Sequence, residues 1–171
     1  MYRKYVLRLI GVVVGLLLLS AATILVLDPA FQYHLPLPGI EATYTNERYQ
    51  NAGLIKNQDY DSVCIGSSVT SNFRASWFDE RFGGKTLKVS YPGGTFADFD
   101  IALETIYATH DIERVYWSLD PRLLAADPQD SESMPTYLYD FNPLNDIQYL
   151  LNKDILLESC AQTVLATLTG T

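Results

Sequence analysis

The chain has 171 residues, about the length of one domain, and its 48% hydrophobic and 19% charged residues exclude a disordered composition. Its formal net charge is −8, and no basic stripe interrupts the acidic surplus, which argues against a nucleic-acid partner. The spacing of its two cysteines and two histidines fits no metal-binding motif, so we expect neither a metal nor a cofactor.

The N-terminal 27 residues have the pattern of a membrane anchor. Residues 1–8 carry Arg3, Lys4 and Arg8, and residues 9–27 carry no charge. A helix of that uncharged length measures about 28 Å, close to the thickness of a bilayer's hydrocarbon core. A cleaved secretory signal is the alternative, but its apolar region is usually shorter. We therefore expect a single-pass plasma-membrane protein with residues 1–8 in the cytoplasm and the bulk of the chain outside.

Residues 28–58 form a connector in this interpretation. Several prolines interrupt regular structure there, although residues 46–56 could form a short helix. Aromatic residues, Phe31 and Tyr33 among them, follow the apolar run, where side chains of the membrane interface are enriched.

The regular part of the pattern, within a domain assigned to residues 59–171, alternates strands and helices. Strands are predicted at 61–65, 86–90 and 113–119, and helices at 70–82 and 95–110. Short loops between alternating elements are typical of a parallel sheet with right-handed crossovers. The expected fold is a three-layer α/β/α, flavodoxin-like sheet after a transmembrane helix. It shows only three strands, so the domain is expected to be partial.

The alternation of predicted strands and helices ends after Pro121. Residues 125–136 read as a polar loop, and Asn142-Pro143 has the composition of a helix start. Residues 154–168 are predicted to form an amphipathic helix whose apolar face holds Leu157, Cys160, Ala161, Val164, Leu165 and Leu168. We expect this face to be covered only in a longer form of the protein, in keeping with a partial domain.

The carboxyl ends of the three strands are the expected ligand-binding edge of such a sheet. The first end is Gly66-Ser67-Ser68, where a glycine permits a tight turn and Ser68 could act as a nucleophile. Gly-Ser turns also occur as ordinary helix starts, with serine as the N-cap.

The other two strand ends offer supporting groups. Pro92-Gly93-Gly94 could supply a backbone N–H to an oxyanion, or be a plain turn capped by Thr95. Asp120 could line the site, or simply belong to an Asp-Pro turn.

A general base for Ser68 is missing from the pattern. His34 lies in the connector, and His110 ends a crossover helix, at the side of the sheet opposite to the ligand edge. Neither histidine is expected to act in catalysis.

Gly66-Ser67-Ser68, followed by a glycine turn after the second strand, resembles the SGNH (GDSL-like) hydrolase superfamily. It looks like the membrane-anchored, extracytoplasmic bacterial branch that includes the D-alanyl transfer protein of teichoic acid modification and alginate acetyltransferase-like proteins. The stretch from Asn46 to Phe73 also resembles an uncharacterised group of such anchored proteins. The resemblance covers roughly residues 28–160.

The resemblance implies roles for individual residues. Ser68 matches the nucleophile, with Ser67 in place of the usual aspartate, and Gly93, or alternatively Gly94, matches the oxyanion-hole glycine. The family's third block normally supplies an asparagine, but here Trp117-Ser118-Leu119-Asp120 stands in its place. The fourth block, Asp-x-x-His, which supplies the base and its orienting acid, has no match.

Two hypotheses follow from this departure. In its complete form the protein would be an esterase or acyltransferase acting on a cell-envelope glycan or wall polymer, and these 171 residues would be an inactive N-terminal portion. Alternatively, it is a non-catalytic anchored scaffold or binding module that associates with envelope membrane proteins. A Rossmann-like nucleotide site is not supported, because no G-x-G-x-x-G follows the first strand.

The cysteines give one further expectation. An extracytoplasmic compartment would permit a disulfide between Cys64 and Cys160, but Cys64 lies in an apolar strand. A buried free thiol is the preferred interpretation of Cys64, and the pairing is left open.

Overall fold

The computed structural model describes residues 2–124 and 134–170. It divides into two compact units, each described by itself below. The first unit holds residues 1–29, 36–45 and 142–171, and the second holds 30–35 and 46–141. Most of the polar loop expected at 125–136 lies outside the described residues.

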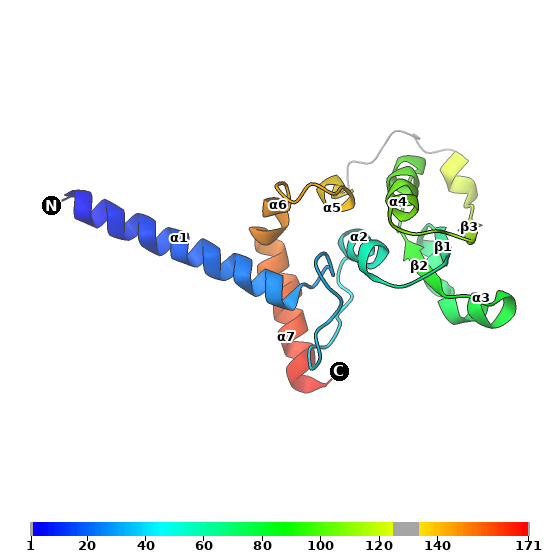
Figure 1. Cartoon of the computed structure of the whole chain (residues 1–171), viewed down its shortest axis with the longest axis horizontal. Helices are drawn as coiled ribbons and strands as arrows, with labels where there is room; N and C mark the ends of the chain where they lie inside the picture. The colour runs from blue at the N-terminus through cyan, green and yellow to red at the C-terminus, as the bar shows by residue number, and fades with distance from the viewer. Residues whose placement is uncertain (1, 125–133, 171) are drawn as a thin grey trace. The chain divides into compact units, whose positions relative to one another are not determined.

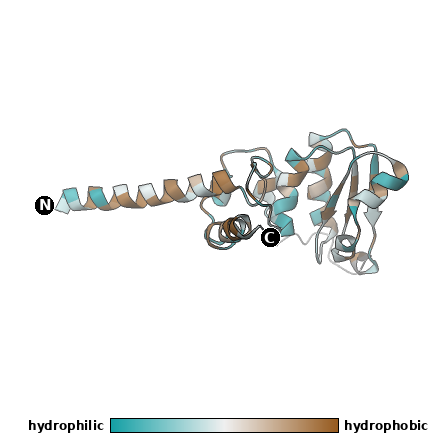
Figure 2. Cartoon of the chain, turned by 90° about the horizontal axis from the view of Figure 1, so that it is seen from below, coloured by the Kyte–Doolittle hydropathy of each residue, from teal (hydrophilic) through white to brown (hydrophobic). Residues whose placement is uncertain are grey.

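The first unit is built on α1 (Tyr2–Leu27), a continuous helix of 26 residues. It is the one helix in the described ranges that is long and apolar enough to cross a membrane, and hydrophobic residues make up most of its length (Figure 2). The helix begins earlier than the predicted span of 9–27, because the basic residues before that span are helical too.

The end of α1 is fixed by a buried carboxylate. Asp28 has a φ of 38°, in the left-handed region, and its N–H donates to the carbonyl of Ile24 at 2.8 Å. The hydroxyl of Tyr149 donates to Asp28 Oδ1 at 2.8 Å, and both residues are buried. Tyr149 belongs to α6 (Ile147–Leu150), so α6 is bonded directly to the point where α1 stops.

The end of the first unit departs from two sequence predictions. The Asn142 side chain accepts the N–H of Leu144, as a helix cap would, but residues 143–146 form turns and the helix α6 begins only at Ile147. The helix predicted over 154–168 begins as a π-helical turn, η3 (Ile155–Ser159), and continues as α7 (Cys160–Thr169). Cys160 is buried, whereas the other residues of the predicted apolar face, Leu157, Ala161, Val164, Leu165 and Leu168, are exposed.

The second unit contains the predicted parallel sheet. Its strands are β1 (Ser62–Gly66), β2 (Thr86–Ser90) and β3 (Arg114–Ser118), in the order β2-β1-β3. Both neighbours pair with β1 in parallel. This confirms the mixed α/β fold and places all three strands within two residues of the predicted boundaries.

Helices cover both faces of the sheet (Figures 1 and 2). On one face, Phe99 of α4 (Phe96–Thr109) contacts Trp117 of β3, with 5.7 Å between ring centroids. α2 (Glu47–Asn57) packs on β2 and α4, and the short α5 (Thr136–Tyr139) packs on α2 and α4. On the other face, Phe78 and Phe82 of α3 (Ala75–Phe82) contact Tyr116. The layers are therefore α/β/α.

The helix predicted over 70–82 is wrong in one respect, because it is two elements. A 3₁₀ helix, η1 (Ser68–Asn72), is separated from α3 by Phe73 and Arg74, which have extended backbones. Side-chain bonds hold η1 to its surroundings: Ser71 donates to the hydroxyl of Ser90 at 3.1 Å, and the Lys88 ammonium donates to the Ser71 carbonyl. These bonds turn the chain before α3 begins. A last described 3₁₀ turn, η2, spans Pro121–Leu124.

A close approach of backbone to α2 gives a stability prediction. A Cβ added at Gly53 would overlap the carbonyl oxygens of Ala30 and Phe31, which lie in the same unit. Gly53→Ala should therefore lower the free energy of unfolding of this unit by about 1–3 kcal/mol, although alanine normally favours a helix. Denaturation followed by tryptophan fluorescence would measure it, since Trp77 and Trp117 both lie in the unit.

A Gly53→Ala variant as stable as the parent chain would show that the 30–31 segment does not pack on Gly53.

Candidate functional site

The three strand ends meet at one edge of the sheet. Gly66, the last residue of β1, pairs with Ser90 of β2 on one side and with Ser118 of β3 on the other. The Tyr91 N–H then donates to the Gly66 carbonyl at 2.9 Å. The residues that follow each strand therefore emerge at the same edge, as the sequence pattern implied.

Gly66 allows the first strand to leave this edge in a tight turn. A Cβ at this position would overlap the hydroxyl of Thr70 and lie 2.9 Å from the Cβ of Ser118. The chain passes from Gly66 directly into η1, with the Thr70 N–H donating to the Ser67 carbonyl at 2.9 Å. A larger residue at position 66 would displace either η1 or β3.

The two serines of the turn differ in their surroundings. Ser67 is buried, and its hydroxyl donates to Asp120 Oδ2 at 3.3 Å. Ser68 is exposed, and within the described ranges no hydrogen bond of its hydroxyl is found. Asp120 therefore lies at this edge of the sheet, where its carboxylate accepts the hydrogen bond of Ser67.

The glycine turn after β2 distinguishes the two candidate oxyanion donors. The Gly94 N–H donates to the Tyr91 carbonyl at 2.7 Å and closes the turn. Gly93 is exposed and has a φ of 67°, which favours glycine. No backbone bond engages the Gly93 N–H among the described residues, so Gly93 is the better placed of the two to donate to a ligand.

An arginine that the sequence analysis did not single out holds this glycine turn. Arg48 of α2 donates to the Pro92 carbonyl at 3.0 Å and, through its other terminal nitrogen, to Asp98 Oδ2 at 3.0 Å. Asp98 is buried and also accepts the Thr95 N–H at 3.1 Å in a capping box. The Thr95 cap was predicted, but nothing in the pattern showed that the Asp98 carboxylate would also bind an arginine from α2.

Two buried tyrosines, Tyr91 and Tyr139, contact the same arginine. The Tyr139 hydroxyl donates to the Arg48 carbonyl at 2.7 Å and bonds the Tyr91 hydroxyl at 2.9 Å. Burial raises the pKa of both tyrosines well above the usual value, so neither ionises near neutral pH. This network positions the backbone of the turn and supplies no proton acceptor to Ser68.

Neither histidine is bonded to the serine turn in the described residues. His110 bonds the Gln58 carbonyl at 3.0 Å and the Thr109 hydroxyl at 2.9 Å, and its ring stacks on Tyr60. Gln58 and Tyr60 precede β1, so this cluster lies at the amino end of the strands. His34 bonds the Leu35 carbonyl at 2.8 Å. A Ser-His pair is therefore not formed.

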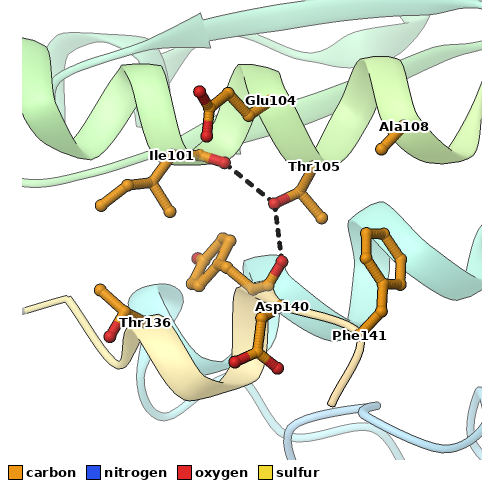
Figure 3. Close-up of a pocket in the computed structure, with 8 residues that line it drawn as sticks. Ile101, Glu104, Thr105, Ala108, Thr136, Asp140 and Phe141 are labelled. Atoms are coloured by element: carbon orange, nitrogen blue, oxygen red, sulfur yellow. Dashed lines mark hydrogen bonds between the residues drawn. The ribbon is translucent and has the colours of Figure 1, made fainter.

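A surface pocket of about 370 Å³ lies between α4 and α5 (Figure 3). The Thr105 hydroxyl donates to the Ile101 carbonyl within α4 and to the Tyr139 carbonyl of α5, both at 2.9 Å. Glu104 and Asp140 are the charged residues that line it, and Phe141 closes one side. None of the serine-turn residues lines this pocket, and its carboxylates would repel an anionic ligand.

Both cysteines are buried free thiols in the structure. Burial raises the pKa of the Cys64 thiol to about 11, against the weaker opposite effect of Lys88. The thiol therefore stays protonated at neutral pH and is a poor nucleophile. In the described part of the chain, no group of three or more His, Cys, Asp or Glu side chains has an arrangement that could hold a metal ion.

No family model matches the chain, and no curated protein or solved structure shows significant similarity to it. The resemblance to SGNH hydrolases therefore depends on the motif residues and their arrangement alone.

The Arg48–Asp98 pair gives the prediction for this site. Asp98→Asn keeps an oxygen that can accept the Thr95 N–H but removes the charge that faces Arg48. We expect the free energy of unfolding to fall by about 1.5–3 kcal/mol, the usual worth of a hydrogen bond to a charged group. Chemical denaturation followed by tryptophan fluorescence would measure the change.

Glu113→Gln is the control for that experiment, because the Glu113–Arg114 pair is 3.6 Å apart and exposed on both sides. Its removal should change stability by less than about 0.5 kcal/mol. If Asp98→Asn lowers the free energy of unfolding no more than Glu113→Gln does, the Arg48–Asp98 pair does not stabilise the unit.

Proposed function

We propose that this chain is a membrane-anchored protein whose α/β unit presents an SGNH-type serine turn for acyl chemistry on a cell-envelope glycan or wall polymer. The apolar length of α1 and the basic residues Arg3, Lys4 and Arg8 support an anchor with its N-terminus in the cytoplasm. The α/β unit would then face the envelope.

One observation carries the proposal. The register of the sheet brings the Ser67-Ser68 turn, the Gly93 turn and Asp120 to a single edge. This is the edge at which open parallel sheets bind ligands. Ser68 is the exposed hydroxyl of the set, and Gly93 is the exposed glycine of the neighbouring turn.

In the proposed reaction, Ser68 Oγ attacks the carbonyl carbon of an acyl ester. The new C–O bond forms as the carbonyl oxygen takes up negative charge, which the Ser68 and Gly93 N–H groups stabilise. The ester oxygen then leaves with the proton that the serine gave up. Water or a glycan hydroxyl attacks the acyl-serine in the second half and restores Ser68. Ser67, Asp120 and Arg48 act as positioning residues.

The step requires a proton acceptor at Ser68. Loss of the histidine from a serine-hydrolase triad lowers turnover by about a millionfold. Both histidines of this chain are bonded elsewhere in the second unit. The proposed activity therefore needs a base from outside the described residues, and the chain alone is expected to be inactive.

The binding-module hypothesis is the second candidate, and the placement of the histidines favours it. In that case the serine turn is an inherited structural feature. Ser68→Ala would then have no effect, whereas changes in the aromatic connector, at Tyr33 or Tyr44, would disrupt association with envelope partners.

A fluorophosphonate probe tests the proposal, because it reacts with activated serines. The full chain in its native membranes, where any natural partner is present, should become labelled, while the purified chain should be labelled at least about a thousandfold more slowly. Ser68→Ala should abolish labelling, and the exposed Ser76→Ala of α3 should leave it unchanged.

Labelling that persists in Ser68→Ala would contradict the assignment of the nucleophile. Absence of labelling in native membranes would favour the binding module.

A further inference from the structure

The helix formed by η3 and α7 leaves most of its leucines exposed. The residues it buries are Ile155 at its start and then Ser159, Cys160 and Thr163, which are small or polar. The residues it leaves exposed include Leu157, Leu165 and Leu168, at 69%, 62% and 79% of their full area. A helix facing water normally buries its leucines.

The buried polar face is held by specific bonds to the segment 36–45. The Thr163 hydroxyl bonds that of Thr43 at 2.9 Å, and the Ser159 hydroxyl bonds that of Thr45 at 3.2 Å. The Thr167 hydroxyl accepts the Glu41 N–H at 3.0 Å. The rotation of the helix about its axis is therefore fixed by these three bonds.

The exposed face is continuous and uncharged. Positions 157, 161, 164, 165 and 168 are spaced by four, three, one and three residues, and side chains at such spacing share one helix face. All five residues are apolar and exposed: Leu157, Ala161, Val164, Leu165 and Leu168. We call this set the leucine face. Glu158 and Gln162 are also exposed and lie at its polar edge.

The leucine face lies beside the proposed membrane span. η3 and α7 pack against α1 in the same unit, near the end where Ile24 is buried. Figure 1 shows α7 running crosswise to α1, with the segment 36–45 on one side of α7 and the length of α1 on the other. Because the polar face is bonded to 36–45, the leucine face is turned toward the side along which α1 extends.

Length and charge decide what can cover this face. Residues 155–169 form about 22 Å of helix, too short to cross the hydrocarbon core of a bilayer. An apolar face on a short helix that runs across a membrane span is typical of a helix lying in the membrane interface. The leucine face contains no lysine or arginine, so it has no means of selecting anionic lipids.

We infer that α7 is an interfacial helix that lies in the plane of the membrane, with the leucine face among the acyl chains of the leaflet in which α1 ends. This inference rests on the proposed function in one respect, that α1 spans the membrane. It adds a second membrane contact, which orients the first unit on the bilayer surface. The contact depends on apolar burial and not on lipid charge.

Depth-dependent fluorescence quenching tests the inference. The full chain, in a Cys64→Ala, Cys160→Ala background, is reconstituted in phosphatidylcholine vesicles with an NBD probe on a single cysteine. Leu168→Cys tests the leucine face, Gln162→Cys is the matched site on the same helix, and Leu17→Cys reports the middle of α1. Lipids with a doxyl group at position 5 or 12 and aqueous iodide are the quenchers.

We expect 5-doxyl lipid to quench the probe at Leu168→Cys at least about threefold more than the probe at Gln162→Cys, and iodide to show the reverse order. 12-doxyl lipid should quench Leu17→Cys. Replacing a third of the phosphatidylcholine with phosphatidylglycerol should change none of these ratios, because the face carries no basic charge.

The outcomes separate the inference from the proposal on which it rests. Quenching at Leu17→Cys without quenching at Leu168→Cys would overturn the interfacial helix and leave the anchor intact. No lipid quenching at either site would overturn the anchor as well. Self-quenching at Leu168→Cys that falls on dilution with unlabelled chain, without lipid quenching, would assign the face to a second copy and overturn the inference.

Discussion

The pairing of Gly66 with both Ser90 and Ser118 is the constraint on which the candidate site depends. A parallel register aligns strand ends, and here it aligns two serines, a glycine turn and an aspartate that are up to 53 residues apart in the chain. The absence of a side chain at position 66 permits the alignment, since Thr70 and Ser118 occupy the space around it. The chemistry of the edge is thus a consequence of backbone geometry, and any change that shifts this register would separate Ser67 from Asp120.

A second interaction fixes the glycine turn after β2. Arg48 supplies it by bonding the Pro92 carbonyl and the buried carboxylate of Asp98 together. A guanidinium suits this position because its planar fork can bond two acceptors from one side chain. α2 is therefore part of the site, although it precedes the sheet in sequence and lies outside the segments that bear the motif.

The sheet and its three ends could be predicted because apolar runs, glycines and cap residues are local features of the sequence. The Thr95–Asp98 capping box is an example, since both partners lie within one helical turn. The Arg48–Asp98 pair joins residues 50 positions apart, and no local pattern encodes it. The break between η1 and α3 was missed for a similar reason, because the bonds that turn the chain there come from Ser90 and Lys88 of another element.

The amphipathic helix at the C-terminal end shows what hydrophobic periodicity can predict and what it cannot. The spacing of its leucines correctly indicated one apolar face, but periodicity cannot say whether that face turns inward or outward. The answer comes from hydroxyls that the hydrophobic pattern ignores, those of Ser159, Thr163 and Thr167, which are bonded to the segment 36–45. Because the polar side of the helix is bonded to the protein, its leucines are exposed. In water, that exposure is unfavourable by about 25 cal/mol for each Å² of apolar area. An adjoining bilayer would remove this cost, so the polarity of α7 is consistent with the membrane environment proposed for α1.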